Sequence, residues 1–270
     1  MSDPRPIGVF DSGVGGLSVL REIRARLPHE DLIYCADSGF APYGSRSPDE
    51  IRERSLFLAE FLLKHDCKAL VIACNTATAA AADYLRTRWP ALPIIGMEPA
   101  VKPATAATRS GVVGVLATVG TLASARFAAL LDTFGNEVEV VMQPCPGLME
   151  CVERGELDTP ATRALLTSYV QPLVQADADV VVLGCTHYVF LRSLVQELVG
   201  PAVKLIDTGA AVAAQLERKL IAASTLALPQ SAGSECFWVS GNDHHMNTTL
   251  QLLWHEQAVF STLPERSLTQ

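Results

Sequence analysis

Aromatic residues and concentrated positive charge are both scarce in this sequence. Only 6% of its 270 residues are aromatic, and 21 lysines and arginines face 29 aspartates and glutamates, which gives a net charge of −8. Nucleic acids and anionic membrane surfaces bind to dense patches of lysine and arginine. Because no such cluster occurs along the chain, we expect neither nucleic acid nor a membrane among its partners.

Long hydrophobic runs and a cysteine framework are also missing. No apolar run reaches the roughly 20 residues of a membrane-spanning helix without a charge or a turn residue. The first residues lack the basic and apolar segments of a signal peptide. Seven cysteines, an odd number without a repeating spacing, do not describe a set of disulfides, and no Cys or His spacing indicates zinc. We therefore expect a cytoplasmic protein with reduced cysteines and no metal site.

What the sequence does contain is a regular alternation of short apolar strands and helices. Hydrophobic residues make up 49% of the chain, which is enough for a sizeable core. Such alternation is typical of parallel sheets with helices on both faces. We expect an α/β fold of two similar α/β domains with mainly parallel sheets and an active site in the cleft between them. The expected strands are 6–10, 31–36, 71–73, 94–97, 111–116, 137–142, 179–184, 203–206 and 236–239. The main expected helices are 17–27, 47–65, 76–85, 127–134, 159–176, 210–222 and 246–254. Ser47, with Pro48 after it and Glu50 three positions on, is the cap expected at the start of the second.

Two cysteines stand at matching places in this pattern. Buried-strand residues run into Cys74 and, 111 positions later, into Cys185. The carboxyl ends of parallel strands bind ligands, and the helix that follows directs its free N–H groups to the same place. Since a helix N-terminus can lower a cysteine pKa below about 8.5, we expect both thiols to ionise readily. The remaining cysteines are most simply buried apolar residues: Cys35, Cys67, Cys145, Cys151 and Cys236.

Two thiols on opposite walls of one cleft suit the inversion of a stereocentre. One base removes a proton from one face of a carbon while the other returns a proton to the opposite face. Acidic and basic groups near the same strand ends can set the protonation of the thiols. The candidates are Asp11 and Asp37 near Cys74, and Glu153 and His187 near Cys185.

A glycine loop follows the first strand and invites a nucleotide-binding reading. In Asp11-Ser12-Gly13-Val14-Gly15-Gly16, however, Ser18 stands where a dinucleotide fingerprint needs its third glycine, and no Gly-Lys-Ser/Thr follows. The loop instead offers a carboxylate, a hydroxyl and flexible N–H groups. Taken by itself, Asp11 could also serve only as the N-cap of the helix that follows.

Four motifs together resemble the bacterial glutamate racemases over essentially the whole chain. They are Asp11-Ser12-Gly13-Val14-Gly15-Gly16, Pro42-Tyr43-Gly44, Ala73-Cys74-Asn75-Thr76-Ala77 and Gly184-Cys185-Thr186-His187-Tyr188. The resemblance implies cofactor-independent interconversion of L- and D-glutamate, the D-isomer being a peptidoglycan precursor. It implies that Cys74 takes the α-proton from D-glutamate and Cys185 takes it from L-glutamate. It also suggests that Asp11 assists Cys74, while Glu153 and His187 assist Cys185.

The resemblance also implies substrate contacts, a domain division and a quaternary state. The implied contacts are Asp11, Ser12, Tyr43, Gly44, Asn75, Thr76, Thr118, Thr121, Thr186 and His187. Hydroxyl and amide groups of this kind can hold two carboxylates without arginine, and Asp11 can meet an ammonium group. Ala117 departs from the glycine that many members have there, which weakens the assignment of Thr118. The second domain would span 98–208, inserted between 1–97 and 209–270, and the family is commonly dimeric.

Three other readings stay open on the sequence alone. A related aspartate or other amino-acid racemase would share both cysteines, although His187 after Cys-Thr favours glutamate. A cysteine hydrolase or transferase would need one thiol and a histidine base, which leaves the second cysteine dispensable. A binding protein on the same scaffold would lack catalytic residues, and none is missing. Because few residues precede the first strand, we also expect activity without a cell-wall-precursor activator.

Overall fold

Two parallel β-sheets form the centre of the molecule, which a computed structural model describes for residues 3–135, 137–229, 232–241 and 245–264. The larger sheet has the strand order β10-β9-β2-β1-β3-β4, and the smaller has the order β6-β5-β7-β8. Every strand pairing within each of these two sheets is parallel, as the alternating pattern predicts. The larger sheet contains β1 (Ile7–Asp11), β2 (Leu32–Ala36), β3 (Ala69–Ile72), β4 (Ile94–Ile95), β9 (Glu235–Val239) and β10 (Phe260–Thr262). The smaller contains β5 (Val112–Ala117), β6 (Glu139–Pro144), β7 (Val180–Leu183) and β8 (Lys204–Ile206).

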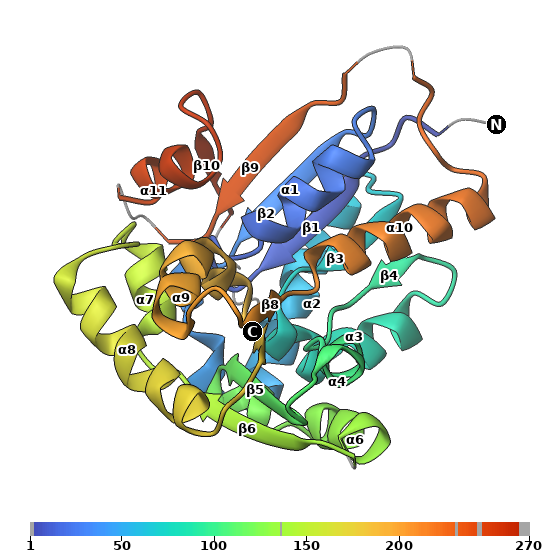
Figure 1. The fold of residues 1–270 in the computed structure, drawn as a ribbon. Helices are drawn as coiled ribbons and strands as arrows, with labels where there is room; N and C mark the ends of the chain where they lie inside the picture. Colours follow the sequence, from blue (N-terminus) through green and yellow to red (C-terminus); the bar gives the residue numbers. More distant parts are fainter. Residues whose placement is uncertain (1–2, 136, 230–231, 242–244, 265–270) are drawn as a thin grey trace.

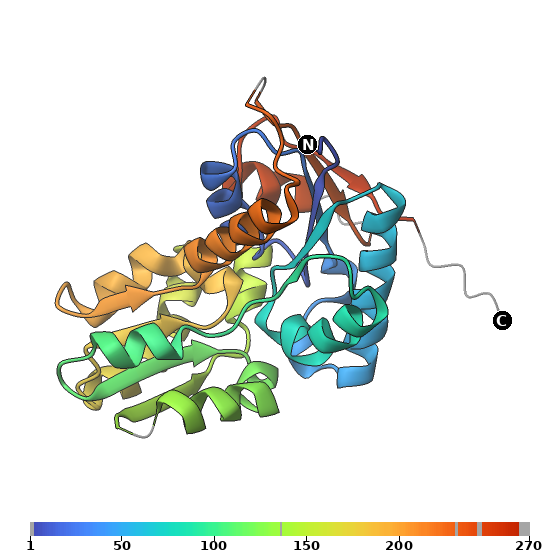
Figure 2. The same ribbon diagram turned by 90° about the vertical axis from the view of Figure 1, so that its right-hand side faces the viewer.

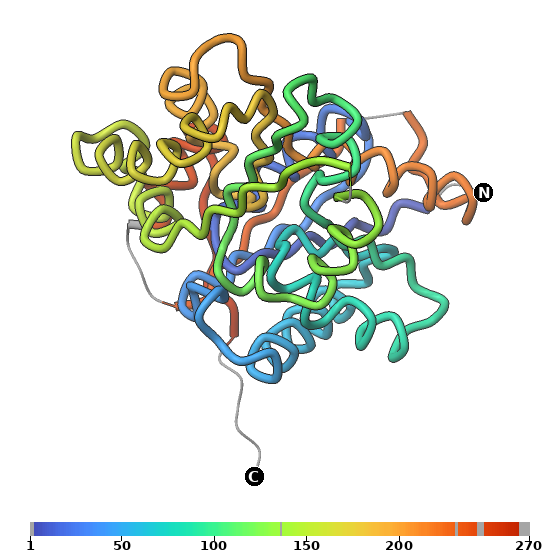
Figure 3. The backbone as a smooth tube through the Cα atoms, turned by 60° about the horizontal axis from the view of Figure 1, so that its bottom comes forward, coloured from blue at the N-terminus to red at the C-terminus, as the bar shows by residue number. Residues whose placement is uncertain are grey.

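The two sheets lie in separate lobes, which Figure 2 shows side by side, and Figure 1 labels their elements. The chain leaves the larger sheet after β4, forms the whole smaller sheet, and returns after β8 to add β9 and β10. The colour gradient in Figure 3 follows this path from cyan through green and yellow to orange. The carboxyl ends of strands from both lobes therefore lie where the lobes meet.

Helices cover both faces of the larger sheet. On one face α1 (Leu17–Arg26) packs against α10 (Gly209–Ala223), and on the other α2 (Pro48–Lys64) packs against α3 (Asn75–Arg88). Alternate strand residues point to opposite faces, so Val9 and Val71 lie in the first core and Phe10 and Ile72 in the second. Strands that are buried on both faces consist of continuous apolar residues, which is why they could be predicted from the sequence.

The smaller sheet is covered in the same way. On one face lie α4 (Val101–Ala107) and α6 (Ala125–Phe134), and on the other lie α8 (Pro160–Gln175) and α9 (Arg192–Val199). The remaining short elements are α5 (Val119–Leu122), α7 (Leu148–Glu153), α11 (His245–Leu253) and the 3₁₀ turns η1 (Ser38–Phe40), η2 (Tyr43–Ser45) and η3 (Thr186–Leu191). Within the described ranges, no helix is long and apolar enough to cross a bilayer.

Several expectations hold and others need correction. The cap at Ser47 is confirmed, because its hydroxyl accepts from the Glu50 N–H while the Glu50 carboxylate accepts from the Ser47 N–H. No local pattern predicts α4, α5 or β10, and the expected helix directly after Cys185 begins as the 3₁₀ turn η3. The domains are similar in kind but unequal in size, with six strands in one sheet and four in the other.

Candidate active site

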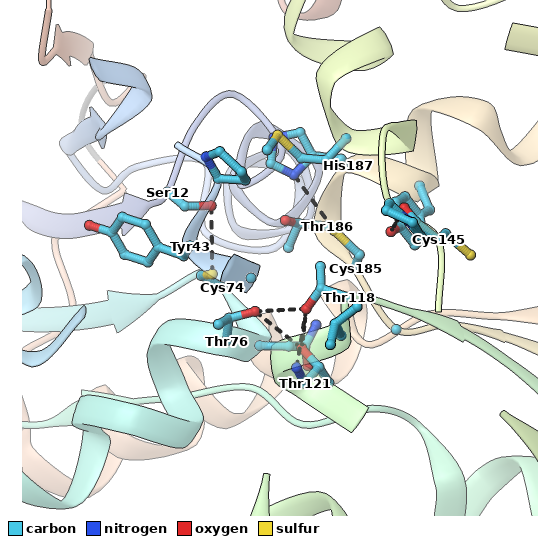
Figure 4. A pocket seen from close by; sticks show the side chains of 18 of the residues that line it. Ser12, Tyr43, Cys74, Thr76, Thr118, Thr121, Cys145, Cys185, Thr186 and His187 are labelled. Atoms are coloured by element: carbon cyan, nitrogen blue, oxygen red, sulfur yellow. Dashed lines mark hydrogen bonds between the residues drawn. The ribbon is translucent and has the colours of Figure 1, made fainter. Parts of the chain in front are cut away.

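A pocket of about 240 Å³ opens where the strand ends of the two sheets meet (Figure 4). Residues after β1 and β3 line it from the larger sheet, and residues after β5, β6 and β7 line it from the smaller. This is the position at which open parallel sheets bind ligands. The lining includes most of the expected site residues: Ser12, Tyr43, Gly44, Cys74, Asn75, Thr76, Thr118, Thr121, Cys185, Thr186 and His187.

Cys74 is the N-cap of α3, as its position after β3 predicts. Its sulfur accepts from the N–H of Ala77 at 3.4 Å and lies 3.8 Å from the Ser12 hydroxyl. The expected lowering of the pKa is wrong for this thiol. Burial, followed by the negative charge of Asp11, raises the pKa of Cys74 well above its ordinary value, and the hydrogen bond from Ala77 does not offset them.

Asp11 is entirely buried beside Cys74. Its carboxylate accepts from the backbone N–H groups of Ser12 at 2.6 Å and Gly16 at 2.5 Å. The Thr186 hydroxyl, from the other lobe, donates to the same carboxylate at 3.2 Å. Burial raises the pKa of Asp11, although His187 acts in the opposite direction. The carboxylate therefore joins the two lobes beside the pocket, and it is not the N-cap of α1, which is Gly16.

Cys185 has a different set of partners. Its sulfur lies 3.7 Å from Nδ1 of His187, and Nε2 of His187 lies 2.6 Å from a Glu153 carboxylate oxygen. Burial by itself would lower the pKa of His187, but hydrogen bonds to Cys185 and Glu153 raise it well above its ordinary value. This arrangement favours a charged imidazole beside the sulfur of Cys185. The 3₁₀ turn that follows Cys185 has no side-chain cap bond. His187 supplies a positive group beside Cys185, whereas the N-terminus of the helix α3 lies beside Cys74.

The glycine loop after β1 makes room for this group of residues. A Cβ atom on Gly13 would stand 1.9 Å from a Glu153 oxygen, and one on Gly15 would stand 2.2 Å from Nδ1 of His187. The N–H of Val14 donates to Glu153 at 2.7 Å across the same contact. The glycines of the first motif thus allow residues from the other lobe to pack directly against the loop, which gives them a use without any nucleotide.

Hydroxyl groups from both lobes meet on the opposite wall of the pocket. The Thr76 hydroxyl lies 3.0 Å from that of Thr118 and 3.2 Å from that of Thr121, as the dashed lines in Figure 4 indicate. A third bond, also 3.0 Å long, joins Thr118 to Thr121. These hydroxyls are hydrogen-bonded to one another. An anionic group that entered the pocket would find several donors there.

The side chain of Asn75 indicates that the pocket binds a polar ligand. Its side chain is 6% exposed and lines the pocket, yet neither its amide nitrogen nor its carbonyl oxygen has a hydrogen-bond partner. A buried amide without partners costs roughly 1–3 kcal/mol, so such groups are uncommon unless a ligand completes them. Among the described lining residues there is no lysine or arginine, which leaves neutral donors to bind carboxylates.

Tyr43 lines the pocket with its ring while its hydroxyl turns away. That hydroxyl donates to the fully buried Asp37 at 2.5 Å, and Arg54 binds the same carboxylate through two nitrogens at 3.0 and 2.6 Å. Asp37 is therefore committed to holding the 37–44 loop and is not free to act on a thiol. The expected substrate contact of Tyr43 is through its ring or backbone.

Sequence reasoning missed part of the lining and misjudged one cysteine, Cys236, while Cys35, Cys67, Cys145 and Cys151 are buried as expected. The residues that follow β6 carry no strong motif, yet Cys145, Pro146, Gly147, Met149 and Glu150 line the pocket. Cys145 is buried, and its thiol donates to the Gln143 carbonyl at 3.3 Å. Cys236 is exposed, contrary to expectation, because β9 lies next to the edge strand and buries Phe237 on its other face. Glu153 lies behind His187 and does not line the pocket. No cluster of His, Cys, Asp or Glu in the described ranges is arranged to hold a metal ion.

The sequence profile of the Asp/Glu/Hydantoin racemase family matches residues 7–216. The chain belongs to this family. It is 61% identical over 253 residues to the glutamate racemase of Ectopseudomonas mendocina, covering 94% of this chain and 96% of that protein. The family assignment agrees with a pocket that two cysteines enter from opposite lobes.

Two solved glutamate racemases with bound ligands share the racemase fold of this chain. The enzyme from Francisella tularensis in complex with D-glutamate superposes with a TM-score of 0.83 at 29% identity, over 97% of this chain and 98% of that one. The Escherichia coli enzyme in complex with L-glutamate and the activator UDP-MurNAc-ala superposes with a TM-score of 0.84 at 31% identity, over 96% and 98%. The two-lobed α/β architecture is therefore that of glutamate racemases.

Proposed function

We propose that this racemase interconverts L- and D-glutamate without a cofactor, using Cys74 and Cys185 as its two acid–base groups. The observation that carries the proposal is the pair of thiols that reach one small pocket from opposite lobes, with the charge of Asp11 acting on Cys74 and the imidazole of His187 beside Cys185. The 61% identity to a glutamate racemase supports glutamate as the substrate.

The proposed reaction moves two protons and leaves no covalent intermediate. With L-glutamate bound, the Cys185 thiolate takes the α-proton and becomes a thiol, while the Cys74 thiol gives its proton to the opposite face and becomes a thiolate. D-glutamate reacts by the same steps in reverse. The charged imidazole of His187 stabilises the Cys185 thiolate, and Glu153 in turn holds that imidazole. Asp11, beside Cys74, takes the assisting role on the other side.

The substrate has a carboxylate at each end and an ammonium group to be held. We propose that hydroxyls and amides hold the carboxylates, since the lining offers Ser12, Asn75, Thr76, Thr118, Thr121 and Thr186. The unpartnered amide of Asn75 and the hydroxyl cluster support this assignment. Asp11 is the carboxylate proposed to attract the ammonium group. Gly44 packs against Thr118 across the cleft, where an added Cβ would stand 3.2 Å from it.

The setting of the enzyme is part of the same proposal. We propose that it works in the cytoplasm and supplies D-glutamate for peptidoglycan and so for cell shape. We propose a division into one domain of residues 1–97 with 209–270 and a second of residues 98–208, which the strand membership of the two sheets supports. A homodimer is proposed on the resemblance to the racemases.

Circular dichroism of glutamate incubated with the enzyme in D₂O tests the reaction. We expect each isomer to converge on a racemic mixture with deuterium at the α-carbon, without added cofactor. Cys74→Ser and Cys185→Ser should each lower racemisation by about 10²-fold or more, because each removes one acid–base group. Aspartate racemisation without glutamate racemisation would support the related amino-acid racemase. If neither amino acid is racemised, the cysteines serve another chemistry, such as that of a hydrolase or transferase that needs only one thiol. The assay should run with and without UDP-MurNAc-ala, and we expect activity without it.

A further inference from the structure

Thr186, the residue directly after Cys185, is tied to the larger lobe at two points. Its hydroxyl donates to the Asp11 carboxylate at 3.2 Å, and its carbonyl accepts from the Ser18 hydroxyl at 3.1 Å. Asp11 ends the strand β1, while Ser18 lies in the first turn of the helix α1. Two separate elements of the larger lobe therefore hold one residue of the smaller lobe.

The Ser18 hydroxyl lies between carbonyl groups of the two lobes. It donates to the Gly15 carbonyl at 2.8 Å and to the Thr186 carbonyl at 3.1 Å. The Gly15 carbonyl also accepts from the Ser18 N–H at 3.0 Å, so the local contact exists without the hydroxyl. The contact that depends on the hydroxyl is the one to Thr186. Both Ser18 and Thr186 are buried, so the hydroxyl makes this contact in place of water.

Ser18 has no direct part in the chemistry of the pocket. It does not line the pocket, and none of the described hydrogen bonds joins it to Cys74 or Cys185. In the sequence it occupies the place at which a dinucleotide loop has its third glycine. Glycine there would supply no hydroxyl. Any influence of Ser18 on the reaction therefore passes through Thr186.

The turn that carries Thr186 depends on contacts from outside itself. The turn η3 is a 3₁₀ segment without a side-chain cap bond, and 3₁₀ hydrogen bonds have poorer geometry than those of an α-helix. It packs against α1 and α7. Cys74, in contrast, caps the 14-residue helix α3 through its own sulfur. The place of Cys185 relative to the pocket is therefore set by tertiary contacts, and that of Cys74 by its own helix.

We propose that Ser18 is a positioning residue for Cys185, because its hydroxyl holds the Thr186 carbonyl and thereby fixes the Cys185 sulfur for proton transfer with the α-carbon. The inference rests on the proposed function, in which Cys185 exchanges a proton with L-glutamate and Cys74 with D-glutamate. No proton passes through Ser18. Its contribution is geometric, since small displacements of a reacting group lower the rate of transfer.

Glutamate deuterated at the α-carbon reports which of the two proton transfers limits the rate. Cys185 removes the deuterium from L-glutamate, and Cys74 removes it from D-glutamate. If the step at Cys185 becomes slower, the isotope effect on kcat/KM rises for the deuterated L-isomer. It falls for the deuterated D-isomer, because the step at Cys74 then limits the rate less. A general loss of active enzyme changes neither isotope effect.

Ser18→Ala removes the hydroxyl without adding volume. We expect kcat/KM to fall by roughly tenfold. The fall should be equal for both isomers, because enantiomers have equal free energies. The ratio of the L- to the D-isotope effect should rise. Ser18→Thr keeps a hydroxyl that can bond to a carbonyl, so it should retain the kcat/KM and the ratio of the unmodified enzyme.

Thr162→Val is the matched control. Thr162 is fully buried at the start of α8, and its hydroxyl donates to the Glu156 carbonyl at 2.7 Å. The replacement removes a buried hydroxyl of the same kind, away from the residues around Cys185. We expect the ratio of isotope effects and kcat/KM to stay those of the unmodified enzyme.

An unchanged ratio in Ser18→Ala would overturn the proposal, whatever the fall in kcat/KM, and so would equal changes in Ser18→Ala and Ser18→Thr. A lower ratio would place the loss at Cys74 and overturn it as well. If circular dichroism shows that Ser18→Ala is unfolded, Ser18→Cys takes its place, because a thiol is only a weak donor, and the same rise is expected. Failure of the unmodified enzyme to racemise glutamate would instead overturn the proposed function.

Discussion

Cys74 and Cys185 end equivalent strands, yet their neighbours give them opposite electrostatic surroundings. Cys74 has the negative Asp11 beside it, and Cys185 has the imidazole of His187. Position at a strand end identified both residues from the sequence, because that position follows from chain order alone. The surroundings depend on contacts between residues far apart in sequence, such as the bond between Thr186 and Asp11. The expected lowering of the pKa of Cys74 was wrong, because burial and then the charge of Asp11 raise it.

Replacing Asp11 with Asn should make Cys74 more acidic. The charge of Asp11 raises the pKa of this thiol, and removal of a nearby negative charge favours the thiolate. The rate of Cys74 alkylation by iodoacetamide should therefore begin to rise at a lower pH in Asp11→Asn than in the parent. Both proteins carry Cys185→Ser, and peptide mass spectrometry identifies Cys74. An unchanged profile, or one moved to higher pH, would contradict the assigned influence of Asp11.

Individual secondary-structure elements followed from the sequence where one local signal sufficed. The Ser47 and Glu50 pair marked the start of α2, and apolar runs marked the doubly buried strands. Elements that depend on tertiary packing left no such signal. The short helix α4 buries Val101 and Ala104 against the smaller sheet, and the turn η3 takes its shape from contacts with α1 and α7. The lining after β6 was missed for the same reason.

One buried ion pair holds three segments of the larger lobe together. Nζ of Lys68, just before β3, lies 2.5 Å from Glu30 and donates to the carbonyls of Asp3 and Thr225. Glu30 in turn accepts from the N–H of Ala227, which follows α10. Lys68→Met should lower the free energy of unfolding by about 3–5 kcal/mol, because it leaves a buried carboxylate without a counter-charge.

Glu30→Met combined with Lys68→Met should cost less than the sum of the two single replacements, since no unpaired charge remains. Urea unfolding of the unmodified protein, the two single variants and the double variant gives the coupling energy between Lys68 and Glu30. Arg52→Met, which removes an exposed pair with Asp49 on α2, is the control and should change stability by less than about 1 kcal/mol. Additive costs for Lys68 and Glu30 would show that the pair does not act as a unit.

On the scale of the whole molecule, polar side chains of the two lobes contact each other at the active-site pocket. Thr76 comes from the larger lobe, and Thr118 and Thr121 come from the smaller, so a ligand bound to these hydroxyls contacts both lobes. Motif order predicted that both cysteines share one cleft. The identity of the cross-lobe contacts required the fold, because the chain forms strands β5 to β8 of the smaller sheet between β4 and β9 of the larger sheet.

Glutamate should therefore stabilise both lobes as one unit. At about 100 times its Kd, a ligand that binds only the folded protein adds about 2.7 kcal/mol, since binding removes folded protein from the unfolding equilibrium. For a chain of this size the Tm should rise by roughly 5–10 °C in a single calorimetric transition. Thr76→Val should shrink this rise because the hydroxyl faces the pocket, whereas Thr133→Val, whose hydroxyl binds the Ala129 carbonyl on exposed α6, should not. Two resolved transitions, with only one moved by glutamate, would mean that the ligand is held by a single lobe and that the bridging role assigned to these hydroxyls is wrong.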